Sequence, residues 1–207
     1  MAIVTRGEMR RAEDTVSYLQ PFVRPGDEVL DVGSGLGLVA ELVRSRITPS
    51  VTCIDVVDLH QGSAPFVLYD GFRIPFPDRS FDVVVCAYVL HHDADHAWLL
   101  SEMKRVTRSR IVVFEDTPRH AFDRLLNLGH ALGSRLKFGS RRMTFRSHAE
   151  WMTLFAALGL EVGSVVNVSI GRQLIYPTTR TLYVLEVGPP PAAAGAPPTA
   201  LRGDEVA

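Results

Sequence analysis

Residues 28–37 read EVLDVGSGLG, a short apolar strand that carries an acidic residue and runs into three alternating glycines. Gly33, Gly35 and Gly37 bring bare backbone close to a ligand, because glycine has no Cβ and tolerates positive φ. The pattern predicts a helix from about Leu36 to Arg46, and the N-terminal amides of this helix point at the same turn. We therefore expect a small polar ligand at the carboxyl end of the strand.

Two details of the turn bear on the kind of ligand. A dinucleotide-binding turn has glycine at its first, third and sixth positions, so that the helix packs on the strand and the pyrophosphate rests on the helix end. Here the sixth position is Leu38. Asp31 precedes Gly33 by two residues, and its charge opposes a pyrophosphate but suits a cation. The turn therefore favours a phosphate-free, partly cationic ligand over a nicotinamide dinucleotide.

Two further segments follow the glycine turn. The apolar strand VTCIDVV contains Asp55, and residues 69–92 read YDGFRIPFPDRSFDVVVCAYVLHH. Together with DVGSGLG, these segments resemble the class I S-adenosylmethionine-dependent methyltransferases, in particular a small bacterial group similar to quinone-biosynthesis methyltransferases. The resemblance covers roughly residues 29–187. It implies S-adenosylmethionine as cofactor, whose ammonium and sulfonium charges suit the turn, and methyl transfer to a small molecule as the activity.

The resemblance also implies a set of cofactor-binding residues at or just beyond strand ends: Asp31, Gly33, Ser34, Gly35, Asp55, Val56, Asp70, Gly71 and Ala87. Asp55 lies about twenty residues after the glycines, where the acid of dinucleotide folds accepts hydrogen bonds from ribose. In the family, Asp70 and the Gly71 amide would bind the adenine edge, and Val56 would pack on its face. Ala87 would offer its carbonyl to the methionine ammonium. Each residue also has a plainer interpretation, because glycine and aspartate after a strand often only form turns.

Histidines and carboxylates follow the next strands. Methyl transfer from a sulfonium mostly requires positioning, and a base such as histidine is needed only when the nucleophile must lose a proton. His91 and His92 follow the strand 81–87 at the edge where open sheets bind ligands, and Glu115 and Asp116 end the following strand. We expect His92 to act as a base or as a hydrogen-bonding group for the acceptor. The alternative is that the double histidine only shapes the loop.

Strand and helix patterns alternate along the chain, which predicts an α/β fold with a doubly wound, mostly parallel sheet. Apolar runs such as VVVCAYVL at 83–90 indicate strands covered on both faces. The expected helices cover residues 10–23, 36–46, 97–106 and 148–160, and the expected strands cover 28–32, 51–57, 66–69, 81–87, 111–116, 161–170 and 179–188. The last two strands look like the antiparallel pair that closes the Rossmann-like methyltransferase sheet. About ten residues join the second and third strands, so any helix there is reduced to about one turn.

Composition fits one domain. The chain has 207 residues, of which 46% are hydrophobic and 22% charged. We expect residues 1–187 to form the methyltransferase domain and residues 188–207, rich in proline and alanine, to be disordered. The formal net charge of -1 argues against nucleic-acid binding. The N-terminus lacks the apolar stretch of a signal peptide and no run of about 18 apolar residues occurs, so we expect a cytoplasmic protein.

Two groups of residues could in principle bind a metal or form a disulfide, but we expect neither. His91, His92, Asp93, Asp95 and His96 crowd one short stretch, but aspartate is expected there as a helix cap and no second cluster is evident, so we expect no metal. In the strand order that the resemblance implies, Cys53 and Cys86 lie on strands that flank the same central strand. Their separation of about 9.5 Å exceeds the reach of a disulfide, so we expect free thiols.

Residues 117–145 are the expected location of the acceptor specificity. Phe122, Leu125, Leu126, Leu132 and Leu136 follow helical spacing, and the stretch from Arg135 to Arg146 is basic. This pattern fits a lid over an amphiphilic, anionic, lipid-like or quinone-like acceptor. It also fits contact with a membrane surface, or a solvated helix that packs on the sheet.

Two rival functions remain open at this point. The chain could be a cofactor-binding but non-catalytic regulatory module, since the residues that bind the cofactor are separable from those that bind an acceptor. A NAD-dependent oxidoreductase is the other alternative, although Leu38 and Asp31 count against it. The identity of the acceptor, its methylated atom and the oligomeric state are left open.

Overall fold

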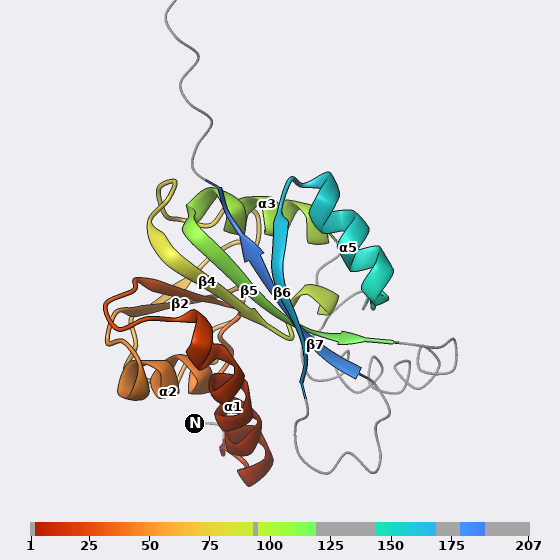
Figure 1. Cartoon of the computed structure of the whole chain (residues 1–207). Coiled ribbons are helices and arrows are strands. Elements are labelled where there is room, and N and C mark those ends of the chain that lie inside the picture. The colour runs from red at the N-terminus through yellow and green to blue at the C-terminus, as the bar shows by residue number, and fades with distance from the viewer. Residues whose placement is uncertain (1–2, 93–94, 119–143, 169–178, 189–207) are drawn as a thin grey trace, which may run out of the picture.

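The computed structural model describes residues 3–92, 95–118, 144–168 and 179–188. Within these residues, helices and strands alternate along most of the chain (Figure 1). The helices are α1 (Arg6–Leu19), α2 (Leu38–Arg46), α3 (His96–Val106) and α5 (His148–Ala157), with short 3-10 turns η1 (Gln20–Phe22) and η2 (Leu90–His92). The strands are β1 (Val29–Val32), β2 (Val51–Asp55), β3 (Phe66–Leu68), β4 (Phe81–Ala87), β5 (Thr107–Thr117), β6 (Glu161–Val168) and β7 (Thr179–Glu186).

The strands form one sheet in the order β3-β2-β1-β4-β5-β7-β6. The first five are parallel to one another, whereas β7 runs antiparallel to both β5 and β6. The strand order reverses between β1 and β4, and open α/β sheets bind ligands at such a switch point, beyond the carboxyl ends of the strands. The structure confirms the expected doubly wound sheet with its antiparallel C-terminal pair.

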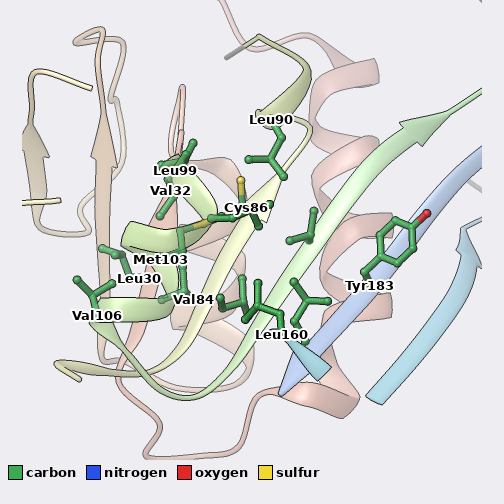
Figure 2. Packing of buried hydrophobic residues seen from close by; sticks show 14 of the residues in the cluster. Leu30, Val32, Val84, Cys86, Leu90, Leu99, Met103, Val106, Leu160 and Tyr183 are labelled. Atoms are coloured by element: carbon green, nitrogen blue, oxygen red, sulfur yellow. The ribbon is translucent and has the colours of Figure 1, made fainter. Parts of the chain in front are cut away.

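Helices cover the two faces of the sheet in separate pairs. On one face, Leu100 and Met103 of α3 and Trp151 and Phe155 of α5 pack in a single buried cluster against the strands. Figure 2 shows part of this cluster, in which Cys86 and its neighbours lie between the sheet and α3. On the other face, α1 and α2 bury their apolar sides against the same strands. Burial on both faces explains the apolar run of β4 from Val83 to Ala87.

The first helix starts earlier than the sequence pattern predicts. Thr5 caps α1, because its side chain accepts a hydrogen bond from the Glu8 amide at 3.2 Å and the Glu8 carboxylate binds back to the Thr5 amide at 2.9 Å. This capping box fixes the helix start at Arg6 rather than Arg10. The first turn of α1 is polar, so apolar periodicity does not reveal it. The helix start predicted from the sequence is therefore one turn too far along the chain.

The link between β2 and β3 contains no helical turn at all. Residues 56–65 are instead tied to α2 by one carboxylate, since Glu41 accepts hydrogen bonds from the amides of Ser63 and Ala64, both at 2.7 Å. Burial alone would raise the pKa of Glu41, but the hydrogen bonds from Ala64 and Ser63 outweigh it and lower that pKa below its ordinary value. The loop therefore keeps a fixed course beside the glycine turn without a helix of its own.

The link between β3 and β4 is clamped by α3. Glu102 accepts a hydrogen bond from the Ile74 amide at 3.0 Å, and Arg105 donates to the carbonyl oxygens of Ile74 and Phe76, both at 2.9 Å. Arg105 also pairs with Asp78 at 2.8 Å. These contacts hold in place the segment that begins with the predicted adenine-binding residues.

Several expectations concern single residues or lie outside the described structure. Cys53 and Cys86 are buried free thiols on β2 and β4, the strands that flank β1, as predicted. The predicted specificity segment lies largely in residues 119–143 and the predicted tail in 189–207, both outside the described residues. Among the helices that are described, none combines the length and apolar character needed to span a bilayer.

Candidate functional site

The glycine turn joins β1 to α2 with left-handed backbone at each glycine. The φ angles are 71° at Gly33, 53° at Gly35 and 80° at Gly37. A Cβ atom at Gly33 would overlap the side chain of Val89, whereas a Cβ at Gly35 would meet nothing within 4 Å. Gly33 is therefore required by packing within the protein, and Gly35 borders open space in which a ligand has room.

Asp55 connects the end of β2 to this turn. Its Oδ2 accepts a hydrogen bond from the Gly35 amide at 2.8 Å, and its Oδ1 accepts from the amides of Val56 and Val57 at 2.7 and 3.2 Å. The carboxylate is only partly buried. The structure therefore brings Asp55 to the glycine turn, twenty residues away in sequence.

Asp31 lies under the turn and is almost fully buried, with 3% of its surface exposed. Its Oδ2 atom is buried and has no hydrogen-bond partner among the described residues. Burial and then the nearby charge of Asp55 raise the pKa of Asp31 to about 7. Such an oxygen is costly to bury alone. A cationic group such as the ammonium of S-adenosylmethionine would offset this cost, so the residues present fit that cofactor.

The predicted adenine-binding residues lie together beside β3. A Cβ at Gly71 would lie 3.3 Å from Cγ1 of Val56, and the Val56 side chain is 54% exposed. Asp70 closes its own turn, because its Oδ1 accepts hydrogen bonds from the amides of Phe72 and Arg73 at 2.9 and 3.3 Å. One oxygen of Asp70 therefore forms the turn, and the binding of adenine by Asp70 stays a prediction.

The end of β4 bends sharply toward the glycine turn. Ala87 is the last residue of the strand, and Tyr88 follows with a φ of 61°, a conformation that costs a non-glycine residue about 1–2 kcal/mol. The Tyr88 amide donates to the carbonyl of Phe114 at 2.8 Å, and the next residue, Val89, packs against Gly33. Strained backbone of this kind often accompanies a functional site.

A buried histidine–carboxylate pair lies just beyond this bend. His91 Nδ1 lies 2.8 Å from Glu115 Oε2, and both side chains are almost fully buried. Burial disfavours the charged imidazole, but Glu115 and Asp116 together raise the pKa of His91 above its ordinary value. His92, the predicted catalytic residue, packs beside this pair with its ring centroid 4.2 Å from that of His91.

The neighbouring carboxylate of β5 serves the opposite face of the sheet. Asp116 Oδ1 accepts a hydrogen bond from Arg180 Nε at 3.1 Å, and the Arg180 guanidinium lies 5.6 Å from the centroid of the Tyr88 ring. Successive side chains of a strand point to opposite faces, so Glu115 and Asp116 end on different sides. The sequence located both acids at the sheet edge but not their separate partners.

Further polar contacts continue along the His91 face. Thr117 and Thr181 share a hydrogen bond of 2.6 Å between their hydroxyl groups, and Tyr183 bonds His148 Nδ1 at 3.0 Å. Burial raises the pKa of Tyr183 to about 12. These residues occupy β5, β7 and α5, so the region depends on elements that are distant in sequence. A polar residue at the end of a buried strand was the only sequence signal for it.

The potential metal ligands after β4 have other partners. Asp95 caps α3, since its Oδ1 accepts a hydrogen bond from the Trp98 amide at 3.0 Å, and His96 accepts from Arg146 at 3.0 Å. Asp93 lies outside the described residues. In the part of the chain that the structure describes, no group of three or more metal-ligating side chains is positioned to hold an ion.

Sequence comparisons agree with this geometry. Residues 30–113 match a family model described as a methyltransferase domain. The ubiquinone/menaquinone biosynthesis C-methyltransferase UbiE of Cupriavidus metallidurans is 32% identical over 124 residues, which cover 53% of this chain and 51% of that protein. The UbiE protein of Burkholderia cenocepacia is 34% identical over 122 residues, which cover 52% and 50%. The chain spans about half the length of these curated relatives.

Solved structures share the fold at lower sequence identity. A Haloferax volcanii protein in complex with the Trm112 methyltransferase activator superposes with a TM-score of 0.67 at 18% identity, covering 89% of this chain and 99% of that one. Magnesium protoporphyrin IX methyltransferase from Synechocystis, with bound SAH, gives a TM-score of 0.62 at 17% identity, covering 89% of each chain. By its sequence relatives and its fold, the chain is similar to the class I S-adenosylmethionine-dependent methyltransferases, and residues 30–113 carry the match to a methyltransferase domain.

Proposed function

We propose that this protein transfers a methyl group from S-adenosylmethionine to a small-molecule acceptor in the cytoplasm. The observation that carries the proposal is the buried, unpartnered oxygen of Asp31 beneath a turn whose Gly35 borders open space. A carboxylate in this position favours a ligand with a positive charge and disfavours a pyrophosphate. This preference separates the proposal from a nicotinamide-dependent reaction.

The cofactor would lie across the carboxyl ends of β1, β2 and β4. In this arrangement Asp31 and the Ala87 carbonyl hold the ammonium, while Asp55 accepts hydrogen bonds from the ribose. The adenine ring packs on the exposed Val56 side chain and meets the turn at Asp70 and Gly71. Gly33 and Ser34 complete the turn, where both amides already donate to the Ile54 carbonyl, at 2.8 and 3.2 Å. The residues proposed to bind the cofactor are therefore Asp31, Gly33, Ser34, Gly35, Asp55, Val56, Asp70, Gly71 and Ala87.

The bound cofactor supplies a methyl group on a sulfonium, which is already activated for displacement. The chain's own residues then have to hold the reacting groups in line and exclude water. Asp31 and Asp55 place negative charge near the cationic cofactor. This charge favours the sulfonium form over the neutral thioether product, so the site should release the product more readily than it binds the cofactor.

The proposal also covers the chemical class of the methyl acceptor, which is inferred from the relatives. The UbiE proteins are named for quinone biosynthesis, so a quinol-like, partly apolar acceptor is the natural candidate. His92 keeps its predicted role as a base or as a hydrogen-bonding group for this acceptor. Replacing His92 by alanine should lower turnover with little change in cofactor affinity, and unchanged turnover would remove it from the mechanism.

Isothermal titration calorimetry tests the cofactor assignment directly. The protein should bind S-adenosylmethionine and S-adenosylhomocysteine and should ignore NAD. Asp55→Ala should weaken cofactor binding at least about 100-fold, because the variant loses both a predicted ribose acceptor and the bond to Gly35. Glu161→Ala, which alters an exposed carboxylate on the edge strand β6, remote from the glycine turn, is the matched control. Absence of binding by the wild-type protein would refute the proposed function.

A further inference from the structure

The pair formed by His91 and Glu115 is unusual for its degree of burial. Glu115 has 0% of its surface exposed and His91 has 2%, and both lie at the carboxyl edge of the sheet rather than deep in the apolar core. Burying a histidine and a carboxylate together carries a large desolvation cost, which good hydrogen-bond geometry only partly offsets. Ionisable pairs retained in this way beside a ligand site are candidates for a chemical role.

We propose that His91, oriented by Glu115, accepts the proton that the methyl acceptor loses, and that the acceptor is therefore a small molecule with an ionisable hydroxyl group. The inference rests on the proposed function, since it concerns the second substrate of the same site. It gives the role of base to the imidazole next to His92 and leaves His92 the other role that the sequence predicted for it, hydrogen bonding to the acceptor.

Glu115 selects the tautomer that such a base needs. Its Oε2 lies 2.8 Å from Nδ1 of His91, and Oε1 also lies 3.4 Å from the His91 amide, so the carboxylate holds both ring and backbone. An ionised carboxylate only accepts hydrogen bonds, so the neutral imidazole must carry its proton on Nδ1. The lone pair is then on Nε2, the ring nitrogen that does not contact Glu115.

The proton balance of the step is simple. The acceptor oxygen forms a bond to the methyl carbon, and the carbon–sulfur bond breaks with its electron pair staying on sulfur. The hydroxyl proton passes to Nε2 of His91, and the resulting imidazolium is stabilised by the Glu115 carboxylate. No oxidant, reductant or further co-reactant is required.

The surroundings of His91 support a base that becomes charged during the reaction. From β5, Glu115 and Asp116 both favour the protonated ring and raise the pKa of His91. From η2, the His92 ring lies against it, and Phe145 stacks on it with centroids 5.0 Å apart and an interplanar angle of 16°. The aromatic contacts fix the ring plane, so that proton transfer needs no reorientation of the imidazole.

The position of His91 also matches the cofactor site. His91 follows Ala87 by four residues, through the bend at Tyr88 and through Val89, which packs against Gly33 of the glycine turn. The hydrogen bond from the Thr144 amide to the His91 carbonyl, 2.9 Å long, fixes the other side of this segment. The imidazole therefore lies on a segment that adjoins both the turn and the end of β5.

The test uses the full-length protein with tritiated S-adenosylmethionine and two probes. One is 1,4-naphthohydroquinone, kept reduced, and the other is its dimethyl ether, which has no ionisable hydroxyl. Methyl transfer should occur to the hydroquinone alone, with kcat rising with pH through one ionisation above the ordinary histidine value. His91→Asn should lower kcat at least about 100-fold while the affinity for S-adenosylhomocysteine changes less than about two-fold.

Glu115→Gln separates a positioning role from a purely structural one. Removing the carboxylate charge lowers the pKa of His91, so the midpoint of the kcat profile should move to lower pH while its plateau falls about 10-fold. Glu115→Asp should restore part of both changes. His96→Asn is the matched control, because His96 is equally buried at 2% but its Nδ1 accepts a hydrogen bond from Arg146, and the kcat profile should be unchanged.

Two outcomes would overturn the inference while leaving cofactor binding intact. One is calorimetric binding of S-adenosylmethionine together with no transfer to the hydroquinone, or equal transfer to its ether. The other is full kcat in His91→Asn, or a Glu115→Gln variant that loses stability with its pH midpoint unmoved. Should a variant fail to fold, nitrogen NMR of wild-type histidines decides the matter, since a proton on Nε2 of neutral His91 contradicts the proposed tautomer.

Discussion

The two halves of the sheet hold their polar groups in different ways. In the N-terminal half, Asp55 at the end of β2 accepts hydrogen bonds from backbone amides, and Asp31 of β1 has one oxygen without a partner among the described residues. In the C-terminal half, the acids near the end of β5 bind other side chains, Glu115 with His91 of η2 and Asp116 with Arg180 near the start of β7. One half therefore leaves acceptor oxygens for a ligand, and the other half has satisfied its own charges.

The difference indicates a division of labour between cofactor and acceptor. A site that binds one invariant cation gains from a fixed carboxylate with unused capacity. A site that takes up a proton gains from a histidine–carboxylate pair, because the carboxylate stabilises the ring once it is protonated. Single substitutions in one half of the sheet test whether the other half changes with it.

The largest effect is expected from Asp31→Asn. The folded-state pKa of about 7 lies above the ordinary value of 3.8, so the carboxyl group stabilises the ligand-free protein at low pH and loses this contribution as pH rises through 7. The variant lacks the buried charge. Its unfolding free energy at pH 8 should therefore exceed that of wild type by about 2–4 kcal/mol, while cofactor affinity falls about 100-fold.

Chemical denaturation between pH 5 and 9, paired with calorimetry, measures both quantities. If Asp31→Asn bound the cofactor as tightly as wild type, the N-terminal half would not owe its function to the unpartnered oxygen. The comparison between halves would then lose its basis.

Gly35→Ala is expected to affect cofactor binding more than stability. The new methyl group would meet nothing within 4 Å in the protein, but it would project into the space left for the cofactor. Affinity should fall about 10-fold or more. Gly26→Ala is the matched control, because Gly26 also has positive φ and also lacks neighbours within 4 Å, yet lies away from the turn.

Both variants should lose about 1–2 kcal/mol of stability from left-handed strain, and thermal melting with and without S-adenosylhomocysteine distinguishes them. Equal loss of affinity in the two variants would mean that Gly35 acts through backbone strain alone.

Thr117→Val tests the C-terminal half without touching the cofactor. The variant removes the 2.6 Å hydrogen bond to Thr181 and leaves that buried hydroxyl with one partner fewer. Unfolding free energy should fall by about 1 kcal/mol, with cofactor affinity unchanged. Thr153→Val, at an exposed position on α5, is the control. A marked change in cofactor affinity would show that the two halves are coupled.

The smallest effect is expected from Glu41→Gln. A carboxylate whose folded pKa is lowered stabilises the protein above its ordinary pKa and loses this contribution as pH falls through the folded value. The variant should be slightly less stable than wild type at pH 7, and the difference should vanish in acid. Hydrogen exchange should quicken at the amides of Ser63 and Ala64, which Glu41 binds. Unchanged exchange there would exclude Glu41 as the anchor of this loop.

Much of the N-terminal half could be predicted because its signals are local. The glycines that need left-handed backbone, the acid at the end of β2 and the apolar runs of parallel strands are each set by the chain within a few residues. The same locality explains the errors at element ends. The start of α1 depends on the cap formed by Thr5, which apolar periodicity does not reveal. The link after β2, expected to hold at most about one helical turn, takes its course from contacts to Glu41.

The C-terminal half resisted prediction because its contacts join distant segments. Glu115 meets His91 from 24 positions away, and Arg180 meets Asp116 from 64 positions away. Nothing in the sequence near His92 reveals that the adjacent histidine faces the carboxylate. The choice between the two imidazoles requires the strand register and the side on which each residue points.

The placement of Glu115 and Asp116 on opposite faces of β5 constrains how this protein can diverge. A point substitution can retune either carboxylate while the other keeps its partner. Insertion of one residue upstream in the strand would instead place Glu115 opposite the guanidinium and Phe114 beside the imidazole, whereas deletion of one residue would place Asp116 beside the imidazole and Thr117 opposite the guanidinium. Lineages that explore new acceptors are therefore expected to keep the length of β5 constant and to accumulate changes in the helices and loops around it.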